Sequence, residues 1–303
     1  MSYSTAFSQS TSPAIDPGKF TFVRLKWTQT PRMSQHEKEI HHWNVDGRNA
    51  EDGPQKGLSA EQCLLSTIEK ATDGLVRVNK TPLSLTIKEF TSPKNTFPFA
   101  FMTEVGWLEF QQEEISPFKN WLDKGGFLMV DDFHGPMYVG APKNGESTYH
   151  NEWRHWTGQL KRLYPDLDID QKPLPYTPVA FYSAQKRPRG KRGPPILMEL
   201  TKEHPVFHSL FSFKDIPHVY GLNALEDAKH MEYGGERHTV VGLFSPEGRL
   251  MILMNYNMDV GDGLERCGEV DVSKVAEKNL YNLLLVPDGL RLGMNYIIYA
   301  LTH

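Results

Sequence analysis

The chain has 303 residues, of which 39% are hydrophobic and 23% are charged, as in an ordinary globular protein. The net charge of −4 and the pI near 6.3 argue against a general nucleic-acid-binding protein, which is normally basic. No stretch reaches the roughly 18 to 20 apolar residues that cross a bilayer, so we expect no membrane insertion through this chain.

The chain opens with a polar segment. Residues 1–19 are rich in Ser, Thr and Pro and lack the basic start and apolar middle of a secretory signal, so we interpret them as a flexible tail. A protein whose signal has been removed would have the same composition, so both a cytoplasmic and an exported location fit. Residues 20–27 alternate apolar and polar side chains, which predicts a strand. A helix is predicted over 60–72, with Ser59 and Gln62 at capping-box spacing.

Two apolar segments flank a second predicted helix. Residues 98–105 and 127–131 are short, continuous apolar runs and predict buried strands. We expect the regular part of the helix between them to begin near Ser116, because Pro117 suits a first helical turn. Strand, helix and strand in this order imply a right-handed crossover and a mostly parallel sheet, with both strands in its interior.

The second half of the chain continues this α/β pattern. Residues 151–165 carry Trp and Leu at helical spacing, whereas the Pro-rich residues 171–195 indicate a long loop or an inserted hairpin. Residues 238–257 predict two strands joined by a turn, and residues 274–303 predict one or two closing helices. No linker divides the chain, so we expect one α/β domain with loop insertions over 20–303.

The clearest candidate site follows the strand at 127–131. Ligands of open parallel sheets bind beyond the carboxyl ends of the strands, where Asp131 and Asp132 lie, with His134 two residues further on. Neighbouring residues of an extended chain point to opposite faces, so at most one of the two acids should face a given pocket. Carboxylates gathered there should raise one pKa by mutual repulsion. We take all three as candidate catalytic residues; the alternative is that the acids only end the strand and shape a turn.

A second candidate lies at the start of the helix predicted over 151–165. Trp153 and Arg154 are candidate ligand-binding residues, because a helix N-terminus favours anions. The alternative is a solvated first turn with Trp153 buried. The spacing of His and Glu around them does not match a zinc-protease pattern.

A third candidate is the loop after the last apolar strand. Asn257, Asp259 and Asp262 stand there around two glycines, and this loop could line the same cleft as Asp131. The twelve-residue register of a calcium loop is absent, and the alternative is a polar turn. Acids, amides and tryptophans would suit a small polar ligand such as a sugar or another polyol, and a divalent metal is compatible with them. The sequence names no cofactor.

The two cysteines give no sign of catalysis. Cys63 occupies a core-compatible position of the helix at 60–72, and Cys267 lies in a late loop with no obvious base. We expect the two not to be bonded to each other. The sequence contains no Gly-x-Ser-x-Gly, P-loop or dinucleotide fingerprint.

Several stretches together resemble one known family. They are "FTFVRLKW", "FPFAFMTEVG", "FKNWLDKGGFLMVDDFHG", "EHPVFHSLF" and "LGMNYIIYALTH". The chain resembles the domain of unknown function 4159 family from about Phe20 to its C-terminus. The Gly-Gly-Phe-Leu-x-x-Asp-Asp run and the Leu-Gly-x-Asn ending carry most of this resemblance. That family is similar to the class I glutamine-amidotransferase-like superfamily, which implies a flavodoxin-like sheet with helices on both faces.

The resemblance does not imply a reaction. Class I amidotransferases use a Cys on a tight strand-to-helix turn, with His and Glu, whereas this strand is followed by Asp131-Asp132-Phe133-His134, so we reject glutaminase chemistry. One hypothesis is a ligand-binding domain, hydrolase-like or sugar-processing, in which a carboxylate is the general base and His134 a second acid or base. The other is a non-catalytic binding or assembly module that kept the fold without the nucleophile. Related proteins are often bacterial and exported or surface-associated; the oligomeric state is left open.

Overall fold

The computed structural model describes residues 15–31, 44, 60–134, 136–139, 148–167, 193–219, 221, 238–265 and 280–303. Most of the loop expected over 171–195 lies outside these residues. The strands of the main sheet are β1 (Val23–Lys26), β2 (Leu83–Thr86), β3 (Phe99–Thr103), β4 (Phe127–Phe133), β7 (Ile196–Glu199), β8 (Thr239–Phe244) and β9 (Leu250–Tyr256). A separate antiparallel pair consists of β5 (Pro136–Val139) and β6 (Thr148–Asn151).

The seven strands lie in the order β2-β1-β3-β4-β9-β8-β7. The first five are parallel to one another, and β8 and β7 continue the sheet antiparallel. The prediction that β3 and β4 are interior strands of a mostly parallel sheet is therefore confirmed. The order of the parallel strands follows the 2-1-3-4-5 pattern of doubly wound sheets, in which ligands bind beyond the carboxyl ends of the strands.

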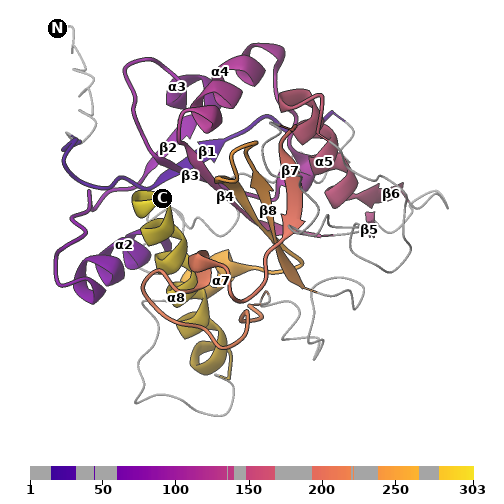
Figure 1. Cartoon of the computed structure of the whole chain (residues 1–303). Helices are drawn as coiled ribbons and strands as arrows, with labels where there is room; N and C mark the ends of the chain where they lie inside the picture. Colours follow the sequence, from indigo (N-terminus) through magenta and orange to yellow (C-terminus); the bar gives the residue numbers. More distant parts are fainter. Residues whose placement is uncertain are drawn as a thin grey trace, which may run out of the picture.

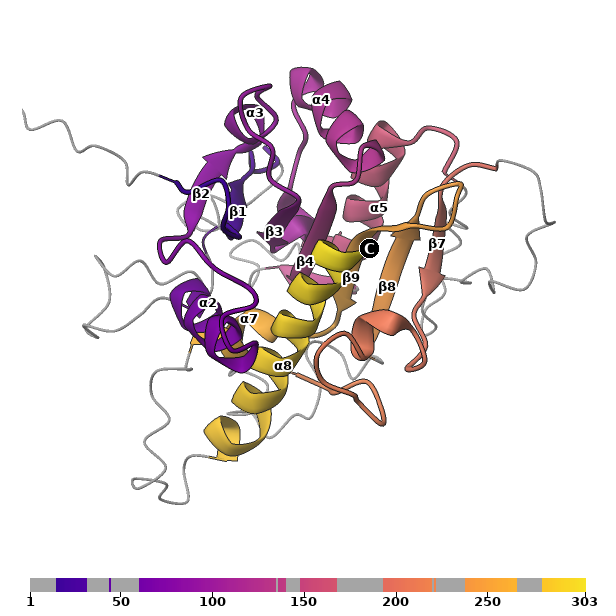
Figure 2. The ribbon, with the colours of Figure 1, turned by 60° about the vertical axis from the view of Figure 1, so that its left-hand side comes forward.

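Helices cover both faces of the sheet, as Figures 1 and 2 show. One face carries α2 (Ala60–Ala71), α7 (Val260–Glu265) and α8 (Leu280–Thr302), and the other carries α3 (Ile87–Phe90), α4 (Gln112–Asp123) and α5 (Glu152–Leu163). The described residues also include the short 3₁₀ turns η2 (Val105–Trp107) and η4 (Pro205–Phe207). Every residue of β3, β4, β8 and β9 is buried, because both sides of these strands face a hydrophobic layer.

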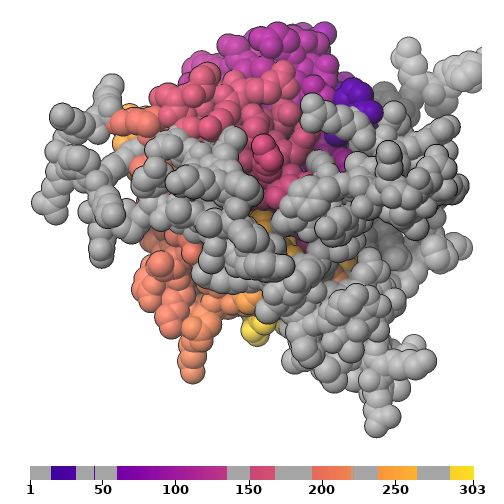
Figure 3. Space-filling view, turned by 90° about the vertical axis from the view of Figure 1, so that its right-hand side faces the viewer, coloured from indigo at the N-terminus to yellow at the C-terminus, as the bar shows by residue number. Residues whose placement is uncertain are grey.

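The helix α4 starts earlier than the sequence predicts. It begins at Gln112, and Pro117 lies inside it rather than in its first turn. Gln111 and Glu114 form a capping box there, which gives backbone N–H groups of the first turn a partner and marks the observed start of the helix. Figure 3 shows α4 and α5 side by side at the top of one flank of the molecule, above the segment around 205–219.

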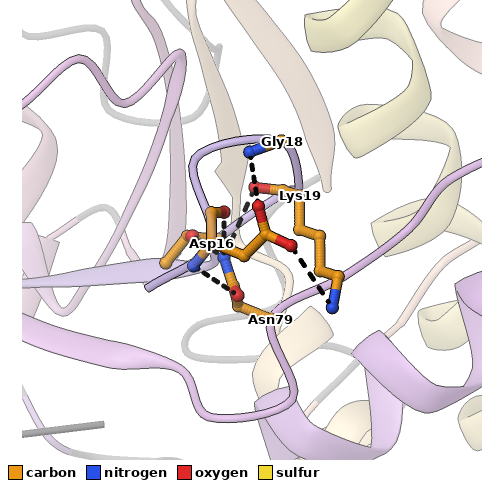
Figure 4. Close-up of polar contacts among 5 residues, drawn as sticks. Asp16, Gly18, Lys19 and Asn79 are labelled. Carbon is orange, nitrogen blue, oxygen red and sulfur yellow. Dashed lines mark hydrogen bonds and ion pairs between the residues drawn. The ribbon is translucent and has the colours of Figure 1, made fainter. Parts of the chain in front are cut away.

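The segment before β1 is attached to the loop before β2. The Asn79 amide group donates to the carbonyl of Asp16 (3.0 Å) and to the hydroxyl of Thr21 (2.7 Å), and its oxygen accepts the Asp16 N–H. The Asp16 carboxylate in turn accepts the Gly18 N–H and lies 3.5 Å from Lys19 Nζ (Figure 4). These contacts hold residues 16–21 of the described chain against the sheet.

The Leu-Gly-x-Asn ending has a structural explanation on α8. The Asn295 side chain is fully buried, accepts the N–H groups of Leu210 (3.0 Å) and Phe211 (2.8 Å), and donates to the Phe211 carbonyl (2.8 Å). A Cβ on Gly293 would meet Leu64 of α2 at 3.3 Å, so this glycine allows α8 to approach α2 closely. The motif therefore joins α8 to two other segments of the fold.

We expected Cys63 and Cys267 not to be bonded to each other, but Cys63 is disulfide-bonded in the structure. Cys267, the other cysteine of the sequence, lies outside the described residues.

Candidate functional site

The first acid of the candidate site, Asp131, links several elements inside the protein through hydrogen bonds. Asp131 is fully buried at the end of β4, where its Oδ1 accepts the Asn255 Nδ2–H of β9 at 2.8 Å. Its Oδ2 accepts the N–H of Gly261 in the first turn of α7 at 2.6 Å. The Tyr296 hydroxyl of α8 donates to Asn255 Oδ1 at 3.1 Å. One carboxylate thus connects β4, β9, α7 and, through Asn255, α8.

Burial governs the ionisation of this group. Removal from water raises the pKa of Asp131 to about 6, and the hydrogen bonds from Asn255 and from the backbone of Val260 and Gly261 oppose this rise. The sequence predicted a raised pKa from repulsion between carboxylates, but the larger cause is burial. The pKa of Tyr296 is also raised by burial, and by the nearby Asp131 charge, so this phenol stays a hydrogen-bond donor.

The second acid lies in a distorted part of β4. The pairing of β4 with β9 shifts register between Val130 and Phe133, as at a β-bulge, and Asp132 has a positive φ of 47°. Non-glycine residues rarely adopt this left-handed conformation, and such strain concentrates at functional sites. The bulge separates the two acids, since Asp131 turns toward α7 whereas Asp132 turns toward His134.

His134 lies between two carboxylates. Its Nε2 is 3.5 Å from Asp132 Oδ1, and its Nδ1 is 3.3 Å from Glu152 Oε2 at the start of α5. Only 5% of the imidazole and 10% of the Asp132 side chain are exposed, so water screens the interaction between these two groups only weakly. An imidazole between two carboxylates is well suited to hold and transfer a proton.

Three neighbouring strands end in the same unusual conformation. Glu104 after β3, Asp132 in β4 and Asn257 after β9 all have positive φ angles between 47° and 54°. The Glu104 N–H donates to the carbonyls of Asp131 and Asp132, and the Asn257 N–H donates to the Phe133 carbonyl. The carboxyl edge of the sheet is therefore built from polar residues whose backbones are held in strained positions by one another.

The predicted loop after β9 does reach the acids of β4. Asn257 is fully buried, and Asp259 is nearly so. The Asp259 carboxylate accepts the N–H of Asp262 at 2.7 Å and so caps α7, which explains both residues as local structure. Asn257 contacts β4 directly, because its N–H donates to the Phe133 carbonyl.

The two candidate residues on α5, Trp153 and Arg154, lie in different surroundings. The Trp153 ring stacks on Phe133 at 5.9 Å and meets Tyr256 edge-on at 5.5 Å, so it belongs to the wall between β4 and β9. Arg154 is exposed, and its N–H donates to the Asn151 side chain that caps the helix. The structure therefore brings Trp153 to the strand ends and leaves the Arg154 side chain facing solvent.

Three residues of this region were not predicted as site residues. Glu152 was expected in a solvated first turn but is 1% exposed, and Asn255 and Tyr296 belong to the hydrogen-bond chain of Asp131. Asn255 left a signal in the sequence, because it is a polar residue inside the apolar run of β9. No such signal marks Glu152 or Tyr296.

Within the described residues, no group of three or more His, Cys, Asp or Glu is arranged to hold a metal ion. None of the described helices is long and apolar enough to cross a membrane.

Comparison with known proteins places the chain in a family. The model of the family described as Domain of unknown function (DUF4159) matches residues 56–185 and 191–301, which together make up most of the chain. No curated protein matches the sequence. The matched regions include the Asp131–His134 segment, the start of α5, β9 and the Leu-Gly-x-Asn ending of α8. The chain therefore belongs to the DUF4159 family.

Proposed function

We propose that this chain is an α/β domain that binds a small polar ligand at the carboxyl ends of β3, β4 and β9, with Asp132 and His134 as an acid–base pair. The observation that carries this proposal is the arrangement of His134, whose two ring nitrogens lie 3.3 to 3.5 Å from carboxylates on different segments. A location beyond the strand ends of a parallel sheet supports it.

The chemistry open to this pair is proton transfer. An ionised Asp132 would accept a proton from a ligand hydroxyl as general base, and His134 would supply or accept a second proton. Carboxylate and amide groups also suit the hydroxyl groups of a sugar or another polyol, with Asn257 as a further hydrogen-bonding side chain. Hydrolysis or another step of sugar processing is the reaction class that we assign.

The proposed relation to the class I glutamine-amidotransferase-like superfamily is consistent with this location. That superfamily places its nucleophile after a parallel strand, and here Asp132, in a left-handed conformation, occupies a strand end. A carboxylate in place of a thiol changes the chemistry at this position. We therefore propose that residues 20–303 share the architecture of that superfamily but do not catalyse its reaction.

A non-catalytic role is the second candidate, and one observation favours it. Asp131 uses both carboxylate oxygens for hydrogen bonds inside the protein. If Asp132 and His134 likewise only stabilise the protein interior, the domain is a non-catalytic binding or assembly module. It would then have kept the fold without a catalytic group.

A thermal-shift titration tests the proposal and separates the candidates. The probes are glucose, myo-inositol and glycerol 3-phosphate, each with and without Mg²⁺ or Ca²⁺. A ligand at 100 times its Kd stabilises the native state by about 2.7 kcal/mol. We expect at least one probe to raise the Tm of the wild type and of the control Asp166→Asn, which changes an exposed acid, and to leave that of Asp132→Asn unchanged.

Each outcome of this titration supports one of the two candidate functions or rejects the site. Chemical conversion of the bound probe supports the enzyme, and binding without conversion supports the module. If no probe shifts the wild type, or if Asp132→Asn responds as the wild type does, the proposed site is wrong.

A further inference from the structure

Glu152 makes two contacts with one residue. It is the first residue of α5 and is almost fully buried. Its Oε2 accepts the backbone N–H of His134 at 2.8 Å, and the same oxygen lies 3.3 Å from the His134 Nδ1. The Trp153 N–H donates back to the His134 carbonyl at 3.0 Å. The backbone of His134 is therefore held on both sides by the start of α5.

A glycine makes room for this carboxylate. Gly106 lies in η2, and a Cβ built on it would be 2.3 Å from Glu152 Cγ and 2.6 Å from Cδ. No real side chain tolerates such distances, so any other residue at 106 would displace Glu152 or the start of α5. The η2 turn and α5 also pack against each other.

We propose that Glu152 is a positioning residue that fixes the orientation and the tautomer of the His134 imidazole, and that Gly106 provides the space it needs. This inference rests on the proposed function, in which His134 transfers protons. Both ring nitrogens face a carboxylate, but Glu152 is nearer to the ring than Asp132 (3.3 Å against 3.5 Å) and more deeply buried (1% against 10% exposed). Because two acceptors do not bond to each other, the single proton of the neutral ring is assigned to Nδ1, beside the nearer carboxylate. The ring then presents Nε2 to Asp132, so proton exchange takes place at that nitrogen.

The charges around the ring support the same assignment. Asp132 faces it from β4 and Glu152 from α5, while Asp131 and Glu104 belong to the adjoining strand ends. Carboxylates within about 4 to 6 Å favour the imidazolium. Removing the Glu152 charge should therefore ease the loss of the His134 proton, whereas removing a buried carboxylate that does not face the ring should not.

The test follows the His134 ring by NMR, in the whole chain labelled with ¹⁵N-histidine and without added ligand. The His134 signal is identified by its absence in His134→Gln. We expect the neutral ring of the wild type to carry its proton on Nδ1. In Glu152→Gln we expect its titration midpoint to fall by about one pH unit or more. Gly106→Ala, which keeps the carboxylate but displaces it, should lower the midpoint in the same direction.

Two matched variants serve as controls. Glu114→Gln removes another buried glutamate from the first turn of a helix, and Gly158→Ala adds a Cβ where no atom lies within 4 Å. Both should leave the His134 midpoint unchanged. An Nδ1-protonated ring with a lowered midpoint in Glu152→Gln supports the assignment.

Two results overturn the inference. The first is an unchanged midpoint in a folded Glu152→Gln. The second is a wild-type neutral ring protonated on Nε2, which is decisive even if the variants do not fold. Because no ligand is present, this outcome is independent of the thermal-shift titration: ligand binding with an Nε2-protonated ring would refute the positioning role alone.

Discussion

At the scale of single residues, Asp131 is fully buried and accepts hydrogen bonds from two other segments, β9 and α7. Its pKa is raised from 3.8 to about 6, so between these pH values the folded protein keeps a proton that the unfolded chain has lost. Stability then falls as the pH rises through this window and stays lower above it. One pH unit corresponds to about 1.4 kcal/mol, so ionised Asp131 lowers the free energy of unfolding by up to ~3 kcal/mol.

Asp131→Asn should remove this pH dependence. The amide keeps the shape and one acceptor for the Gly261 N–H, so we expect the variant to exceed the wild type in stability by about 1 to 3 kcal/mol at pH 8 and to match it near pH 4. Urea unfolding between pH 4 and pH 8 measures both values. The exposed Asp166→Asn is the control. A variant less stable than the wild type at pH 8 would mean that the ionic hydrogen bonds outweigh the effect of burial.

The sequence locates some of these residues and not others. Asp131, Asp132 and His134 were identified because an apolar strand ends in charged residues, which is a local pattern. The Asp131–Asn255 hydrogen bond joins residues 124 positions apart, and it forms only because β9 is inserted beside β4. The burial of Glu152 depends on the approach of α5 to Gly106, and no local pattern encodes it.

At the scale of elements, continuous apolar runs were the reliable signal. The helix predicted over 60–72 is α2 at 60–71. The run at 98–105 contains β3, and the run at 127–131 is the first part of β4, which continues to Phe133. The edge strands β2 and β7 have four residues each and are partly exposed, so pairing with a neighbour decides their conformation more than their own sequence does.

Asn295 tests how one element is attached to the rest. Asn295→Ala would leave the Leu210 and Phe211 N–H groups and the Phe211 carbonyl without their α8 partner. Buried groups that lose a partner cost about 1–3 kcal/mol each. Leu210 and Phe211 are only partly buried, so we expect the free energy of unfolding to fall by ~2–4 kcal/mol, less than the full penalty for three groups. Chemical denaturation measures this. Ser209→Ala, which removes an exposed hydrogen bond of the same segment, should change stability by less than about 1 kcal/mol, and an equal loss in both variants would contradict the prediction.

At the scale of the whole molecule, the sheet is buried at its centre and open at its edges. The strand–helix–strand order predicted the parallel part correctly, and the turn at Ser245–Gly248 joins β8 and β9 as expected. The sequence did not determine where this hairpin would join the sheet. Its attachment through β9 to β4 aligns the Asn257 turn with Asp131 and Asp132, and thereby creates the candidate site.

This arrangement predicts a gradient of stability across the sheet, which native-state hydrogen exchange measures. β3, β4 and β9 are buried and paired on both sides, so their amides should exchange only through global unfolding. β2 pairs with β1 alone and alternates between partly buried and exposed residues, so its amides should exchange through local opening at a free energy lower by at least about 2 kcal/mol. β7 at the other edge should resemble β2, because it pairs with β8 alone. Equal protection of β2 and β4 would show that the sheet opens as one unit, and a rapidly exchanging β4 would remove the rigid support that the Asp132–His134 pair requires.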